Sequence, residues 1–180
     1  YSTRVFFFFI LLNDVKMNYN GGSNMQIQLR KMRLEDADVL FYLTSDQECG
    51  KYMKTGPHQM LSQTQDMVHK YCKFPNYGFI IETENHEMVG YTGLSAMEQQ
   101  GQYSISIMVF PKFWQGGIAT QAVKLIIEFA KNSDMIQEIV AFIVEKNIGS
   151  VRVCQKCGFE HIETFEERDR QIGMYQLKVS

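Results

Sequence analysis

Apolar residues in the second half of the chain recur with two different periods. Between residues 117 and 131 they return every three to four positions, which predicts a helix with one buried face. A shorter helix is predicted from 148 to 157, because Gly158 follows as a typical C-terminal stop. Residues 136 to 144 are almost continuously apolar and rich in β-branched side chains. That pattern indicates a strand covered on both faces, as in a central parallel position.

The remaining patterns predict more strands and two further helices. Alternating or short apolar runs indicate strands at 26 to 33, 77 to 83, 88 to 94, 103 to 109, 159 to 165 and 173 to 179. Helices are predicted from residue 34 to 43 and from 62 to 71, and the first opens with acidic side chains. The polar residues 84 to 87 predict a hairpin, and the charged residues 166 to 170 a loop. The order β-α-α-β-β-β-α-β-α-β-β predicts an α/β (α+β) fold, with a mixed central sheet of about six or seven strands and about four flanking helices.

The first 24 residues differ from this pattern. Residues 5 to 12 read VFFFFILL, which is far shorter than the ~20 residues of a membrane-spanning helix and is not followed by a small-residue cleavage site. Residues 18 to 24 (NYNGGSN) have the composition of a flexible linker. We therefore expect residues 1–24 to be an appendage and residues 25–180 to form one domain. The appendage is an added strand, an arm that packs on a partner subunit, or non-native sequence.

Size and charge limit the classes of function. The 180 residues suffice for one domain with a sizeable core, and a formal net charge of −2 predicts no nucleic-acid partner. The four cysteines are too few for a disulfide framework in a domain of this length and are expected to be free thiols in a reducing, cytoplasmic compartment. We expect no membrane association, and a monomer or a homodimer.

The segment between the strand at 103 to 109 and the long helix carries the clearest chemical signal. It contains a glycine pair, Gly116 and Gly117, immediately before the helix. The first turn of a helix has N–H groups without intrahelical partners at the positive end of its dipole, and glycine lets a ligand approach the backbone. Residues 115 to 120 therefore predict a phosphate site, although a glycine pair at this place is also compatible with a plain tight turn.

Three motifs together resemble a known superfamily. They are Trp114-Gln-Gly-Gly-Ile-Ala119, Asn147-Ile-Gly-Ser150 about 30 residues later, and the Gly158-Phe159 pair that follows. In this order and spacing they resemble the acetyl-CoA-dependent N-acetyltransferases abbreviated GNAT, and most of all the RimJ/RimL-like branch that acetylates ribosomal-protein N-termini. The resemblance covers residues 26 to 180. It implies a GNAT-like acyl-CoA N-acyltransferase fold whose sheet is splayed at the fourth strand.

The resemblance also implies which residues hold acetyl-CoA. Backbone groups around the glycine pair would bind the pyrophosphate (Gln115, Gly116, Gly117, Ile118, Ala119 and Thr120). A bulged, splayed strand end would pair with the pantetheine arm (Ile107, Met108 and Val109), and the Val109 amide would face the thioester oxygen. Asn147 would bind pantetheine, although Asn is also a favoured helix cap. The chain departs from the family pattern at Trp114, where Arg or Gln is common.

Catalytic residues are harder to predict. Acyl transfer to nitrogen requires a neutral amine, a polarised carbonyl and protonation of the leaving thiolate. Many family members use a Tyr as the acid where this chain has Cys154. In the RimJ/RimL-like branch the Ser of the Asn-x-x-Ser motif has that role. We predict Ser150 as the acid and Cys154 as the second candidate, with a tunnel-lining role for Cys154 as the alternative. The base is not identified; Glu82, Glu84 and Glu98 are on or near the central strands.

The predicted reaction is transfer of acetyl from acetyl-CoA to a primary amine by direct attack in a ternary complex. The acceptor would be a protein N-terminus, a polyamine or an aminoglycoside-like molecule, entering between residues 45–71 and 165–172. The Cys154-x-x-Cys157 pair has no second pair and no His at metal spacing, so no metal is expected. Two alternatives remain: a non-catalytic acyl-CoA-binding sensor or interaction module, and a structural protein that binds no CoA.

Overall fold

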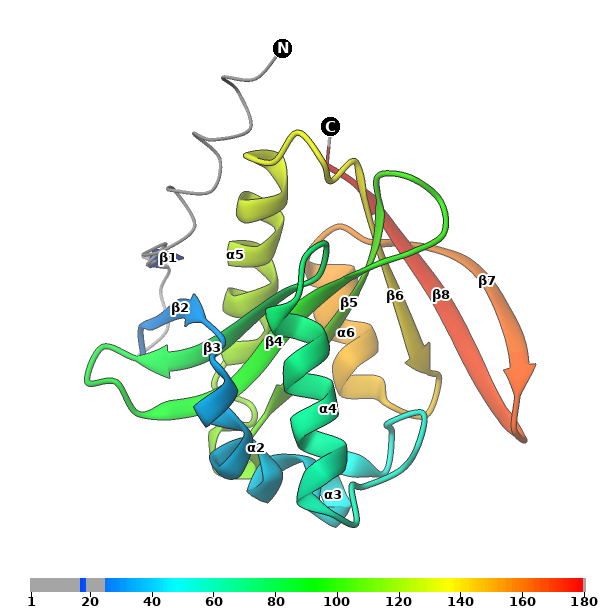
Figure 1. The fold of residues 1–180 in the computed structure, drawn as a ribbon. Coiled ribbons are helices and arrows are strands. Elements are labelled where there is room, and N and C mark those ends of the chain that lie inside the picture. Colours follow the sequence, from blue (N-terminus) through cyan, green and yellow to red (C-terminus); the bar gives the residue numbers. More distant parts are fainter. Residues whose placement is uncertain (1–16, 19–24, 180) are drawn as a thin grey trace.

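A computed structural model describes residues 17–18 and 25–179 of the chain. The described residues form one mixed sheet with helices packed on both of its faces (Figure 1). The strands are β1 (Met17–Asn18), β2 (Ile27–Lys31), β3 (Tyr77–Thr83), β4 (Met88–Ala96), β5 (Gln102–Val109), β6 (Glu138–Val144), β7 (Glu160–Glu167) and β8 (Arg170–Lys178). The helices are η1 (Leu34–Asp36), α2 (Ala37–Thr44), α3 (Gln47–Gly50), α4 (Leu61–Cys72), η2 (Pro111–Phe113), α5 (Ile118–Lys131) and α6 (Ile148–Lys156), of which η1 and η2 are 3-10 helices.

The sheet has the order β1-β2-β3-β4-β5-β6-β8-β7. Only the β5–β6 pair is parallel among the described strands, and α5 makes the crossover that joins these two. A parallel pair needs such a crossover because its strands cannot be joined by a tight turn. At this parallel pair, the C-terminal end of β5 therefore leads to the N-terminus of α5.

Each face of the sheet has its own apolar core. Helices α5 and α6 cover one face, where Ile126 and Ile139 are completely buried. Helices α2 and α4 cover β3 and β4 on the other face, around Leu40, Val68 and Ile80. The amphipathic pattern of residues 117–131 is satisfied in this way, since α5 buries its apolar stripe against the sheet.

Most predicted elements are confirmed, with differences at short elements and turns. The strand predicted at residues 77–83 coincides with β3, and the predicted hairpin joins β3 to β4. The sheet has one strand more than the upper estimate because the two-residue β1 pairs with β2. The four-residue α3 was not predicted, since so short a helix has no readable period. The predicted loop at 166–170 is wrong: the β7–β8 turn is only Arg168 and Asp169, both with positive φ.

The predicted splay is confirmed at the fourth strand of the domain. β5 pairs with β6 only from Gln102 to Ser104, opposite Glu138 to Val140, and then the two strands separate. The bulge that accompanied this prediction is absent from the described strand, because β5 stays in unbroken register with β4 from Tyr103 to Val109. The gap therefore opens by divergence from β6 alone.

The predicted appendage lies almost entirely outside the described residues. Met17 and Asn18 are the exception and form β1 on β2. Within the described ranges, no helix combines the length and apolar character that a membrane span requires.

Candidate functional site

The splay leaves one side of β5 open at the centre of the sheet. The Phe110 N–H donates to the Val89 carbonyl at 2.9 Å, which places Phe110 in a hydrogen-bonded pair with β4. Because successive residues of a strand point their backbone groups to opposite sides, Met108 also faces β4, whereas Ile107 and Val109 face the gap toward β6. Residues 104 to 108 are only partly buried although the strand is central. An extended ligand therefore has backbone groups to pair with at this place.

The N-terminus of α5 follows directly after the splayed strand end. The first intrahelical hydrogen bond runs from the Gln121 N–H to the Gly117 carbonyl at 3.0 Å. The N–H groups of Ile118, Ala119 and Thr120 come before it and have no intrahelical acceptor. Gly117 is left-handed, with φ of 76°, and a Cβ built there would meet nothing within 4 Å. The described first turn of the helix contains no acidic side chain. Open space, unpaired amides and the positive end of the dipole suit a phosphate.

A second left-handed residue precedes the glycine pair. Gln115 has φ of 65°, a conformation uncommon for a residue with a side chain. Such outliers cost of order 1–3 kcal/mol and gather at ligand-binding loops. Gln115, Gly116 and Gly117 are all exposed, so the backbone of this loop is accessible.

Trp114 connects the loop to the strand end. Its indole Nε1–H donates to the Val109 carbonyl at 2.7 Å. The Cys49 thiol donates to the same oxygen at 3.8 Å from α3, on the other face of the sheet. The peptide between Val109 and Phe110 is therefore held at its carbonyl by side chains and at its N–H by Val89. The spacing of residues does not predict this role, because a single Trp in a loop has no period. The departure from the family pattern at Trp114 was the one signal in the sequence that pointed to this residue.

The residues predicted on α6 lie at its start and on its buried side. Asn147 is the N-cap, and its Oδ1 accepts the Ser150 N–H at 3.2 Å. This is the capping role weighed as the alternative to pantetheine binding. The two roles are compatible, because the cap uses the oxygen and the Nδ2 group is a separate donor. Ser150 is half-buried, and Cys154 is 6% exposed in the core that includes Val109.

Burial changes the acid–base properties of Cys154. Desolvation raises the pKa of this thiol to about 12, with a smaller contribution from Cys157. A thiol with this pKa stays protonated at neutral pH, and it donates its proton less readily than a group titrating near the working pH. Its position in the apolar core fits a lining role better than an acid role.

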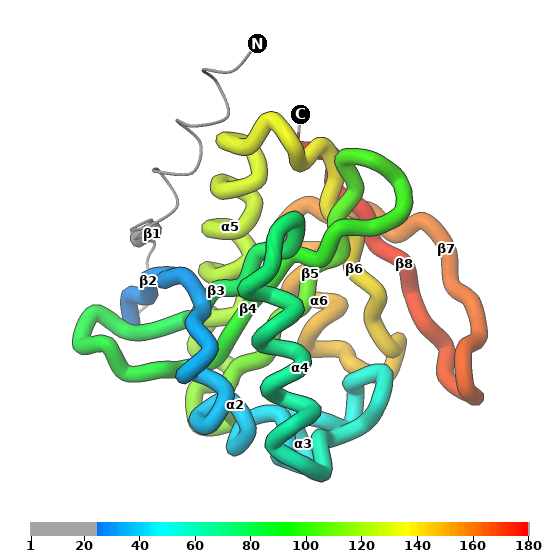
Figure 2. The backbone as a smooth tube through the Cα atoms, in the orientation of Figure 1, coloured from blue at the N-terminus to red at the C-terminus, as the bar shows by residue number. Residues whose placement is uncertain are grey.

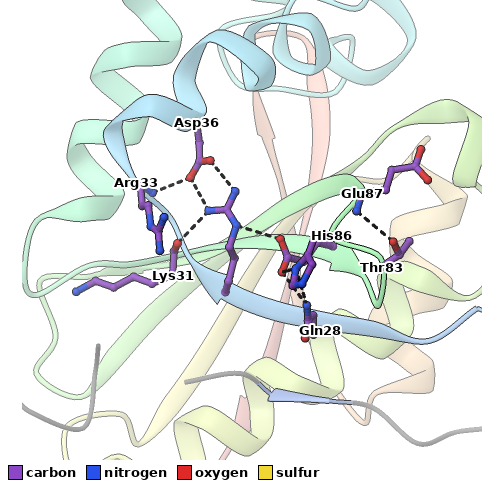
Figure 3. A network of polar contacts seen from close by, with 9 residues as sticks. Gln28, Lys31, Arg33, Asp36, Thr83, His86 and Glu87 are labelled. Atoms are coloured by element: carbon purple, nitrogen blue, oxygen red, sulfur yellow. Dashed lines mark hydrogen bonds and ion pairs between the residues drawn. The ribbon is translucent and has the colours of Figure 1, made fainter. Parts of the chain in front are cut away.

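None of the three carboxylates considered as the general base lies at the gap between β5 and β6. Glu82 is 4% exposed in a polar network between β2, β3 and η1 (Figure 3). It accepts from Gln28 at 2.8 Å and from Arg30 at 3.0 Å, and Arg30 also binds Asp36 at 2.7 Å. These contacts tie the edge strand to the sheet. Glu84 lies in the β3–β4 turn and Glu98 in the β4–β5 connection, both exposed. The described residues contain no group of three metal-ligating side chains.

The two segments expected to flank the acceptor do meet. Arg170 donates to the carbonyls of Met53 at 3.1 Å and Lys54 at 3.3 Å, and Arg168 donates to Lys54 at 3.2 Å. The Lys54 ammonium pairs with Glu167 at 2.8 Å. The loop between α3 and α4, cyan in Figure 2, thus joins the tip of the β7–β8 hairpin. The charged tip of the hairpin binds this loop and is not merely solvated.

Comparison with known proteins gives concordant results. The family profile of the acetyltransferase (GNAT) domain matches residues 26–160. The uncharacterized N-acetyltransferase p20 of Bacillus licheniformis is 31% identical over 164 residues, which cover 86% of this chain and 92% of that protein.

Two solved structures share the fold. Spermidine N-acetyltransferase from Vibrio cholerae in complex with CoA and spermine has a TM-score of 0.75 at 14% identity, over 84% of this chain and 95% of that one. AAC(6')-Ib in complex with ribostamycin and coenzyme A has a TM-score of 0.73 at 18% identity, over 84% of this chain and 93% of that one.

Proposed function

Since the chain belongs to the GNAT family of acetyltransferases, we propose that it transfers the acetyl group of acetyl-CoA to a primary amine. The observation that carries this proposal is the end of β5–β6 pairing at Ser104, immediately before a helix N-terminus with open backbone amides. Gln115 to Thr120 would hold the pyrophosphate. The backbone groups of Ile107 and Val109 that face the gap, together with Asn147, would hold the pantetheine arm, while Met108 between them is paired with β4.

In the proposed reaction an amine nitrogen attacks the thioester carbon while both substrates are bound. The new C–N bond forms as the C–S bond breaks, the amine loses a proton and the sulfur gains one. Amides of the open side of β5, that of Val109 first, would donate to the carbonyl oxygen as its charge grows. An α-amine with a pKa of about 8 is partly neutral at cellular pH, so a strong base is not essential.

Ser150 is our proposal for the proton donor to the sulfur. It lies in the first turn of α6, its backbone N–H is held by the Asn147 cap, and it is less buried than Cys154. The two solved structures named above are complexes with spermine and with ribostamycin, both amines, which supports an amine acceptor. We also propose a cytoplasmic location, on the ground of the free cysteines, and a place in the RimJ/RimL-like branch, on the ground of the sequence motifs.

The direct test is release of free thiol from acetyl-CoA during incubation with a panel of primary amines. The panel contains a ribosomal-protein N-terminal peptide, spermidine, kanamycin and simple alkylamines. Amine-dependent thiol release with an acetylated product confirms the reaction, and a reaction without amine is the control. Calorimetric binding of CoA with no release for any amine would contradict transfer, and the absence of CoA binding would contradict the assigned site.

A further inference from the structure

Two phenylalanines form an exposed apolar surface on the part of the sheet made by β6, β8 and the edge strand β7. Phe142 is on β6, which has a strand on either side, yet 46% of the residue is exposed; Phe165 on β7 is 37% exposed. Their rings are in edge-to-face contact, with centroids 6.3 Å apart. We call these two side chains the aromatic shelf. Packing a ligand on two adjacent rings removes apolar surface from water and so stabilises the bound ligand.

The strand register shows on which face the shelf lies. Phe142 is opposite Met174 and Phe165 is opposite Ile172, and residues directly opposite share a face of the sheet. Arg170 is on this same face by alternation, and it binds the carbonyls of Met53 and Lys54. The shelf therefore lies on the face of the α3–α4 loop, opposite the face covered by α5 and α6.

The register also places the shelf beside the splay. The last β5–β6 pair is Ser104 with Val140, so Phe142 lies two residues farther along, at the level of Ser106. Ile107, whose backbone faces the gap, is the next residue of β5. With α5 and α6 on the opposite face, an amine that reaches the gap from the open face passes Phe142.

Resting on the proposed function, we infer that the aromatic shelf selects the acceptor: a primary amine attached to an alkyl or arylalkyl group. The apolar group packs on Phe142 and Phe165 while the amine enters the gap. Phe142 is then a specificity-determining residue. Apolar contact with two rings stabilises such an acceptor by removing surface from water on both sides.

The charges near the shelf fit a single ammonium better than a polycation. Glu167 is already paired with Lys54 at 2.8 Å. Glu163 is opposite Met174, so it lies on the same face as the rings. It is two residues before Phe165 on β7 and is therefore the carboxylate next to the shelf in the described part of the sheet. A polyamine with several ammonium groups needs several carboxylates along its length, because a buried unpaired charge is costly.

The test compares acceptors and one substitution. We expect kcat/KM for 2-phenylethylamine and hexylamine to exceed that for spermidine and kanamycin at least tenfold. Phe142→Ala is expected to lower kcat/KM for 2-phenylethylamine about tenfold, mostly through KM, with no change in the Kd of CoA. The matched control is Tyr42→Ala, which removes an aromatic ring that is 74% exposed on α2, away from the shelf.

A preference for spermidine or kanamycin would contradict the proposed role of the aromatic shelf and leave the proposal of acetyl transfer intact. Equal kinetics of Phe142→Ala and wild type would do the same. Failure of every amine to release thiol would refute the proposed function instead. In that case calorimetric titration of the CoA-bound protein with 2-phenylethylamine still decides. Tighter binding by wild type than by Phe142→Ala supports the shelf, and equal or absent binding overturns it.

Discussion

Gly117 combines a left-handed backbone with open space where a side chain would begin. We predict that Gly117→Glu abolishes CoA binding, because it places a negative charge next to the amides that would hold phosphates. Gly117→Gln is the matched control, since it has the same size and the same backbone strain of order 1 kcal/mol without the charge. Calorimetry on both folded variants measures the Kd. Loss of binding that is equal in the two would assign the effect to strain.

Ser150 and Cys154 differ in their surroundings although both are on α6. We predict that Ser150→Ala lowers kcat at least tenfold, whereas Cys154→Ala changes kcat less than threefold. With its pKa raised to about 12 by burial, Cys154 does not titrate in the assay range, so its removal should leave the pH–rate profile between pH 6 and 10 unchanged. Near-wild-type rates for both variants would exclude both as the proton donor.

At the scale of elements, buried His58 joins the loop after α3 to two helices. Its backbone N–H donates to the Thr44 carbonyl at 2.9 Å, and its ring Nδ1 lies 2.9 Å from the Thr64 hydroxyl. Burial lowers the pKa of His58 below its ordinary 6.5. Below pH 6.5 the unfolded chain therefore takes up a proton that the folded chain does not, and stability falls as the pH falls.

We accordingly expect the free energy of unfolding to decrease below pH 6.5, by no more than about 1.4 kcal/mol per pH unit from this one group. His58→Gln should flatten the pH dependence, and His69→Gln, at an exposed position on α4, should not. Urea unfolding from pH 5 to 8 measures both slopes. An unchanged slope for His58→Gln would assign the pH dependence to other groups.

The elements that could be predicted are those whose pattern extends over several residues. The amphipathic repeat of 117–131 gave α5, and the apolar run before Val144 gave β6. The two-residue length of the turn at Arg168 and Asp169 could not be foreseen, because its second position lacks the Gly that such positive-φ turns prefer. Contacts made by tertiary packing could not be predicted either. The hydrogen bond of Trp114 to Val109, for example, corresponds to no periodic pattern in the sequence.

For the whole molecule, the contact between the hairpin tip and the α3–α4 loop joins segments more than a hundred positions apart in sequence. Arg170 makes this contact with two N–H groups on neighbouring carbonyls. Arg170→Lys keeps the charge but loses the planar pair of donors. We predict a KM for the amine three- to tenfold higher, an unchanged Kd for CoA, and a change in unfolding free energy below about 1 kcal/mol, because the contact is at the surface.

Steady-state kinetics and hydrogen exchange of residues 51 to 56 check this prediction, and faster exchange of that loop is expected in the variant. Arg33→Lys, an exposed position at the start of η1, is the control. A KM that stays at the wild-type value would show that the hairpin contact does not shape the acceptor side.

The chain contains one tryptophan, Trp114, and it lies directly before the loop proposed to hold phosphates. Its indole is half in solvent, with 47% of the residue exposed, and is hydrogen-bonded to the end of β5. Indole fluorescence responds to solvent contact and hydrogen bonding, so the protein carries an intrinsic optical probe at the proposed entrance for CoA. Ligand arrival can therefore be timed by stopped flow from emission alone, without a label and separately from catalytic turnover.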